Sequence, residues 1–95
     1  MMIPKATTVR LKGVPLKKLV EAVYKRDNHE CIICGAWVED GVKPHHEPQG
    51  SRKSDELDKM VLLCMRCHHE RHSGKKSEEI RLQVEKYLQG TRDRP

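Results

Sequence analysis

Aromatic residues are almost missing from this chain. Phenylalanine is absent, and the 95 residues include only Trp37, Tyr24 and Tyr87 as aromatics. Proteins that bind single-stranded nucleic acid usually stack bases on aromatic side chains, so this composition argues against that class. Hydrophobic residues make up only 36% of the chain against 35% charged residues. A core with so few apolar residues in so short a chain is expected to need additional stabilisation, such as a bound metal ion.

Long apolar runs are missing as well. No segment approaches the roughly 20 apolar residues that span a bilayer. The first residues, Met-Met-Ile-Pro-Lys, lack the apolar stretch of a secretion signal. We therefore expect a cytoplasmic protein without a membrane partner. In a reducing compartment, paired cysteines are more typical of metal ligands than of disulfides.

The chain has four cysteines in two Cys-x-x-Cys pairs, Cys31 with Cys34 and Cys64 with Cys67. This spacing is typical of zinc knuckles, and four thiolates complete a tetrahedral site with no open position. We therefore predict a structural zinc ion, which contributes about 10 kcal/mol to folding in peptide zinc sites. A redox role of either pair and a two-disulfide scaffold are the weaker alternatives.

Hydrophobic periodicity predicts a small α+β domain. An amphipathic helix is expected from Pro15 to about Asn28. Residues 37–38 and 60–63 are strand candidates, and residues 47–58 form a polar loop. Two further helices are expected over 65–72, ended by Ser73-Gly74, and over 77–90, with Ser77 as N-cap, Gly90 as stop and Ile80, Val84, Tyr87 and Leu88 on the apolar face.

The histidines are not needed for the zinc site, so they are free to form a second centre. His68 and His72 are four residues apart and share one helix face, while the adjacent Cys67 diverges from His68 by about 100°. His45 and His46 follow a strand-like segment, and in an extended chain their side chains point to opposite sides. The alternative is that these histidines are extra zinc ligands or solvated groups, which is our interpretation of His29 and His69.

Residues 24–73 resemble the HNH endonuclease family, in its zinc-ribbon branch with the ββα-metal (His-Me finger) motif. The resemblance rests on Tyr-Lys-Arg-Asp-Asn-His-Glu-Cys-Ile-Ile-Cys-Gly, Pro-His-His-Glu and Val-Leu-Leu-Cys-Met-Arg-Cys-His-His-Glu-Arg-His. It implies a nuclease domain over 14–90 with its core at 24–73, flanked by N- and C-terminal helices. A basic arm (1–13) and a frayed tail (91–95) complete the expected organisation.

The resemblance also implies roles for individual residues. His46 matches the general base that activates water for attack on a phosphodiester. His45 and His68 match ligands of the catalytic metal, and His72 matches a last histidine that binds metal or contacts phosphate. Lys59 stands where the family has an asparagine that positions the general base. Lysine offers no acceptor, so either Asp58 or Asp55 takes over this role, or Lys59 contacts a phosphate, or the site is weakened.

The expected partner is double-stranded DNA. The net charge is +5, which suits salt-dependent contact with a phosphate backbone. Candidate contacts are Arg52, Lys53, Arg66, Arg71, Lys75 and Lys76. The catalytic ion is left open among Mg²⁺, Mn²⁺, Zn²⁺, Ni²⁺ and Co²⁺. One metal site in a monomer or weak dimer is expected to nick one strand.

Two other functions stay open. The chain could be a zinc-ribbon module that binds DNA without cutting it, which the lysine at position 59 favours. It also resembles the small HNH proteins of phages and prophages, so an accessory role in phage DNA packaging beside a terminase is a further alternative. Glu47 and Glu70 are interpreted as solvated or structural carboxylates.

Overall fold

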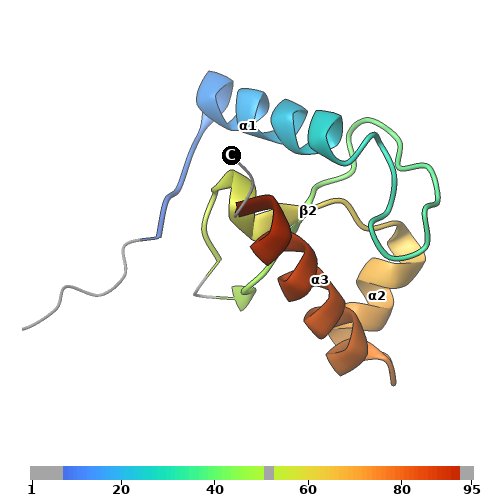
Figure 1. Ribbon diagram of the computed structural model, residues 1–95. Coiled ribbons are helices and arrows are strands. Elements are labelled where there is room, and N and C mark those ends of the chain that lie inside the picture. Colours follow the sequence, from blue (N-terminus) through green and yellow to red (C-terminus); the bar gives the residue numbers. More distant parts are fainter. Residues whose placement is uncertain (1–7, 51–52, 93–95) are drawn as a thin grey trace, which may run out of the picture.

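The computed structural model describes residues 8–50 and 53–92, the side chain of residue 92 excepted. The predicted small α+β fold is confirmed, with helices around a two-stranded sheet (Figure 1). Its elements are α1 (Gly13–Arg26), β1 (His45–His46), η2 (Leu57–Lys59), β2 (Met60–Val61), α2 (Met65–Ser73) and α3 (Ser77–Arg92). Most of the expected arm, Arg52 and the last three residues of the expected tail lie outside the described residues. Among the described residues, no helix is long and apolar enough to cross a membrane.

Helix α1 is the predicted amphipathic helix, although it begins at Gly13 rather than Pro15. Its last residue, Arg26, joins it to η2 and to the sheet, because the guanidinium donates to the Leu57 carbonyl at 2.6 Å and to the Met60 carbonyl of β2 at 2.5 Å. The next residue, Asp27, is a buried junction that the sequence did not reveal. Its carboxylate accepts a hydrogen bond from the Leu62 backbone N–H at 3.0 Å and another from the Tyr87 hydroxyl. Asp27 therefore joins the end of α1 to the segment after β2 and to α3.

The first cysteine pair lies in a tight turn, as predicted for a zinc knuckle. The Gly35 N–H donates to the Cys31 carbonyl at 2.8 Å, and Gly35 adopts φ 79°, which glycine tolerates best. The Ile32 N–H donates to the Leu62 carbonyl at 3.1 Å. This bond brings the knuckle next to the segment that leads into α2. The strand expected at residues 37–38 is reduced to one bridge between Glu30 and Trp37.

Strands β1 and β2 pair antiparallel, with His45 opposite Val61 and His46 opposite Met60. The strand predicted over 60–63 stops at Val61, although Leu62 and Leu63 stay fully buried. Its ladder ends because the Leu62 N–H and C=O bond to Asp27 and Ile32 instead of a neighbouring strand. The apolar residues of this segment form the centre of the core.

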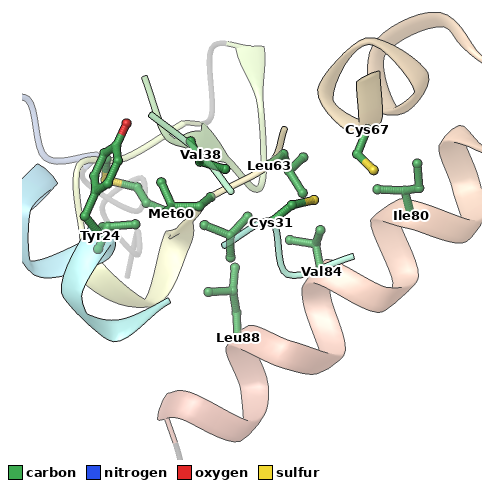
Figure 2. Close-up of a cluster of buried hydrophobic side chains, with 12 residues drawn as sticks. Tyr24, Cys31, Val38, Met60, Leu63, Cys67, Ile80, Val84 and Leu88 are labelled. Atoms are coloured by element: carbon green, nitrogen blue, oxygen red, sulfur yellow. The ribbon is translucent and has the colours of Figure 1, made fainter. Parts of the chain in front are cut away.

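Helices α2 and α3 lie side by side (Figure 1). The predicted apolar face of α3 is confirmed, since Ile80, Val84 and Leu88 point into the core from this helix (Figure 2). Gly90 does not end α3, which continues to Arg92. A glycine weakens a helix interior by about 1 kcal/mol but ends a helix only where it adopts a left-handed conformation.

Candidate metal centres

The four cysteines come together at the junction between the knuckle and the start of α2. Their sulfur atoms all lie within 4.8 Å of one another, and the Sγ atoms of Cys34 and Cys64 are 3.6 Å apart. Zinc–sulfur bonds of about 2.3 Å in a tetrahedron place sulfur atoms about 3.8 Å apart. The four-cysteine cluster is therefore compatible with a structural zinc ion.

The thiols of this cluster differ in their surroundings. A backbone hydrogen bond at Ala36 and the neighbouring cysteines lower the pKa of the exposed Cys34 to about 7. Burial raises the pKa of Cys67. Arg66 lies beside the cluster, where its contact with Cys34 raises the pKa of its guanidinium. The positive charge of Arg66 therefore favours the thiolate forms that metal binding requires.

Three histidines form a second cluster, which joins β1 to α2. One ring nitrogen from each of His45, His68 and His72 lies within 4.8 Å of the others. The Nε2 atoms of His68 and His72 are 3.0 Å apart. Metal–nitrogen bonds of about 2.0–2.1 Å place ligand nitrogens about 3.3 Å apart. The cluster therefore fits one ion with three imidazole ligands and an open position, the pattern typical of catalytic sites.

The environment keeps two of these imidazoles neutral. Burial, together with the neighbouring His45 and His72, lowers the pKa of His68 to about 4. Burial and the nearby His45 and Arg71 also lower the pKa of His72. Neutral imidazole is the form that binds metals. At neutral pH, His68 and His72 therefore have lone pairs available without losing a proton.

Behind the cluster lies a buried ion pair that the sequence did not reveal. Glu47 accepts hydrogen bonds from both sides of the Arg71 guanidinium, each at 2.9 Å, and its Oε1 lies 3.1 Å from Nε2 of His45. Burial alone would raise the pKa of Glu47, but His45 and Arg71 outweigh it and lower this pKa to about 2. Glu47 is therefore an ionised carboxylate that orients a candidate metal ligand.

Arg71, one of the predicted DNA contacts, is occupied by this ion pair. Arg71 is only 7% exposed, and besides Glu47 it contacts Ser77 at the start of α3. All three nitrogens of its guanidinium donate to side chains of the protein. Ser77 likewise has a different role from the predicted N-cap, because its hydroxyl bonds to the Arg71 carbonyl. Lys53, Arg66, Lys75 and Lys76 are exposed.

His46 lies outside the three-histidine cluster, as the alternation along β1 requires. Its Nε2 lies 2.8 Å from Oδ1 of Asp55, and the two side chains are 20% and 10% exposed. A carboxylate accepts but does not donate, so it fixes the imidazole proton on Nε2. The other ring nitrogen, Nδ1, is then left with a lone pair that can accept a proton.

Lys59 does not replace the amide of the resembled family. Its ammonium lies 3.1 Å from the Glu56 carboxylate. Its backbone carbonyl accepts from the Glu47 N–H at 3.0 Å, which extends the pairing of β1 with β2. Of the two candidate substitutes, Asp55 contacts His46, whereas Asp58 makes no side-chain hydrogen bond to any described residue.

The remaining histidines differ in their surroundings. His29 stacks on Trp37 with ring centroids 4.8 Å apart and meets the edge of Tyr24 at 4.9 Å. His69 is exposed on α2. Within the described part of the chain, neither residue belongs to a group that could hold a metal ion.

No protein-family model matches the chain, and no curated protein and no solved structure is significantly similar to it. The family resemblance therefore rests on the motif residues alone. The geometry adds an independent observation, which is that two clusters with metal-binding spacing occur within one small fold.

Proposed function

We propose that this protein is a metal-dependent endonuclease of the HNH type that hydrolyses phosphodiester bonds in duplex DNA and nicks one strand per site. The observation that carries the proposal is the cluster of His45, His68 and His72, in which His45 directly precedes the candidate general base, His46. The cluster supplies three ligands and an open position. His46 follows His45 in the chain, and its Nε2 contacts Asp55, so Nδ1 is the ring nitrogen that can face water.

The order of elements supports this proposal. Two antiparallel strands, β1 and β2, are followed by helix α2. His45 of β1 and His68 and His72 of α2 stand at the positions that the family resemblance assigns to the catalytic metal. The cysteine cluster holds the first turn of this same helix, because the Cys67 N–H donates to the Cys64 sulfur at 3.4 Å. A structural zinc at the cysteines would therefore fix the helix that carries the reaction centre.

The proposed chemistry divides between the chain and the ion. When bound, a divalent ion would offset charge on the phosphate and stabilise the leaving 3′-oxygen. Nδ1 of His46 takes the proton from the attacking water, and Asp55 keeps the imidazole in the orientation that presents this nitrogen. The water oxygen forms the new bond to phosphorus as the bond to the 3′-oxygen breaks, and this oxygen takes up a proton from solvent water. The products are a 5′-phosphate and a 3′-hydroxyl.

The charge distribution supports a polyanionic substrate. The net charge is +5, and Lys53, Arg66, Lys75 and Lys76 are exposed around the loop after β1 and along α2 and the turn that follows it. Lysine and arginine contacts to the phosphate backbone give binding that falls steeply with salt and reads little sequence. Phenylalanine is absent and the chain has one tryptophan and two tyrosines. Since proteins that bind a single strand usually stack its bases on aromatic side chains, duplex DNA fits better.

A second candidate is a zinc-ribbon module that binds DNA without cutting it. The ion pair between Lys59 and Glu56 favours it, because the residue at the family's asparagine position then contacts Glu56 instead of His46. This candidate predicts salt-dependent DNA binding that is unaffected by substitution of His46.

Relaxation of supercoiled plasmid tests the two candidates. With Mg²⁺ or Mn²⁺ we expect conversion to open circles, its loss with EDTA, and a decrease of at least about 100-fold for His46→Ala, since general bases contribute about 10²- to 10⁴-fold. His69→Ala on the exposed face of α2 is the matched control and should cut like the wild type. Conversion that survives His46→Ala would contradict the assigned mechanism, and no conversion with any divalent ion would favour the binding module.

A further inference from the structure

We propose that Asp55 is the positioning residue of His46, and that the segment Val9–Leu11 before α1 holds Asp55 in place. The inference rests on the proposed function, because it names the residue that orients the proposed general base. According to this proposal, residues Val9–Leu11 support the reaction centre, although they lie outside the residues that carry the family resemblance.

The first step is the contact between Asp55 and His46. Oδ1 of Asp55 lies 2.8 Å from Nε2 of His46, and both side chains are largely shielded from water. Because the carboxylate is an acceptor only, it selects the tautomer with the proton on Nε2. A carboxylate that holds an imidazole in one tautomer and orientation raises its efficiency as a base.

The second step is the contact on the other carboxylate oxygen. Oδ2 of Asp55 accepts a hydrogen bond from the Leu11 backbone N–H at 2.8 Å. With one oxygen bonded to Leu11 and the other to His46, the carboxylate cannot rotate without losing a bond. Burial would raise the pKa of Asp55, but these two donors and the charge of Arg10 outweigh it and lower this pKa. Asp55 is thus held as an ionised carboxylate.

The third step is the backbone pairing of the two segments. The Asp55 N–H donates to the Val9 carbonyl at 2.9 Å. The Val9 N–H donates to the hydroxyl of the buried Ser54 at 2.7 Å. Together with the bond from Leu11, these contacts join two segments that are far apart in the sequence. They fix the loop at the point where it carries Asp55.

A purely structural role is the competing explanation, in which the bond to His46 only fastens the loop. The two roles differ in what Asp55→Asn changes. An asparagine offers one acceptor oxygen, so it cannot accept from both Leu11 and His46. If the oxygen stays with Leu11, the amide NH₂ faces His46 and favours the tautomer with the proton on Nδ1. That tautomer has no lone pair at the nitrogen that must accept the proton from water.

The test uses the full-length protein with zinc at the cysteine cluster. In the wild type, ¹⁵N chemical shifts of the His46 ring should report the Nε2–H tautomer, and the Leu11 amide should exchange slowly with solvent. In Asp55→Asn we expect a shift toward the Nδ1–H tautomer or faster exchange of the Leu11 amide, and a kcat about 100-fold lower with KM and metal binding unchanged. Asp58→Asn, three residues further along the chain in η2, is the matched control and should change none of these.

Each result decides between the two roles. A wild-type His46 in the Nδ1–H tautomer would overturn the proposal before any variant is made. So would an Asp55→Asn protein that keeps both its kcat and its His46 tautomer, or one in which only the melting temperature falls. Failure of the wild type to nick DNA would instead overturn the proposed function alone, because the tautomer and the Leu11 exchange still show whether Asp55 holds His46.

Discussion

Oε1 of Glu47 lies 3.1 Å from Nε2 of His45 and 2.9 Å from Nε of Arg71. A single carboxylate oxygen thus connects a candidate metal ligand on β1 to a buried guanidinium on α2. The contact to His45 leaves Nδ1 of that ring as its metal-binding nitrogen. The carboxylate–histidine arrangement fixes the ring orientation, and such partners of metal ligands contribute strongly to affinity.

Glu47→Gln should weaken metal binding at the histidine cluster by about 10- to 100-fold, the range typical of lost carboxylate partners of ligating histidines. The amide oxygen of glutamine can take the place of Oε1, but its NH₂ group then faces the Arg71 N–H that donates to Oε2, and the negative charge between His45 and Arg71 is lost. Calorimetric titration with Co²⁺ or Ni²⁺, after zinc is loaded at the cysteines, measures the affinity. Glu70→Gln on the same helix as Arg71 is the control and should bind as the wild type does. Equal affinities for Glu47→Gln and the wild type would remove Glu47 from the site.

His72→Ala should reduce the bound metal from two ions per chain to one. Two imidazoles bind a divalent ion much more weakly than three, whereas the cysteine cluster does not involve His72. Elemental analysis after dialysis against excess metal gives the stoichiometry. His69→Ala, which alters the next exposed histidine of α2, should retain both ions. Two ions retained by His72→Ala would show that the second centre lies elsewhere.

The sequence predicted those features that depend on local spacing. The helical period of Ile80, Val84 and Leu88 defines the buried face of α3, and the Cys-x-x-Cys spacing predicts the knuckle. The i, i+4 spacing of His68 and His72 placed them on one face of a helix, and the structure brings His45 to the same place. Each of these follows from backbone geometry over a few residues, which a single sequence contains.

The contacts that could not be predicted from the sequence all depend on how segments distant in the chain meet. Four acids occur between residues 47 and 58, and nothing local distinguishes Asp55 from Asp58 as the partner of His46. In the sequence, Arg71 looks like the other predicted DNA contacts on and after α2, which are exposed. In the structure it is buried against Glu47. The one usable indication was that Glu47 stands two residues after His45, so in an extended strand both side chains lie on one face.

Cys34→Ser should unfold the protein instead of producing a folded, inactive variant. The core is small, and the cysteine cluster joins the knuckle to α2 in a chain with few apolar residues. Loss of a structural zinc removes about 10 kcal/mol or more, which exceeds the stability of a typical small domain. Circular dichroism should show loss of helical signal at 25 °C. A folded Cys34→Ser protein without zinc would contradict the structural role, and Ser73→Ala, an exposed change on α2, is the control.

His68 should remain neutral far below the pH at which histidines usually gain a proton. Burial and the neighbouring His45 and His72 lower its pKa from 6.5 to about 4. Because the folded state disfavours the charged form, the unfolded chain binds more protons between these two values. His68 therefore makes folding less favourable as pH falls from about 6.5 toward about 4.

This expectation can be measured by NMR on protein that carries zinc at the cysteines only. The ring shifts of His68 should stay constant between about pH 7.5 and 5.5, a range above the lowered pKa and across the usual histidine value. His68→Gln should show a smaller loss of stability over the same range, since glutamine does not titrate. A His68 midpoint near pH 6.5 would show that its ring is solvated. The close packing of the three rings would then be absent from the metal-free site.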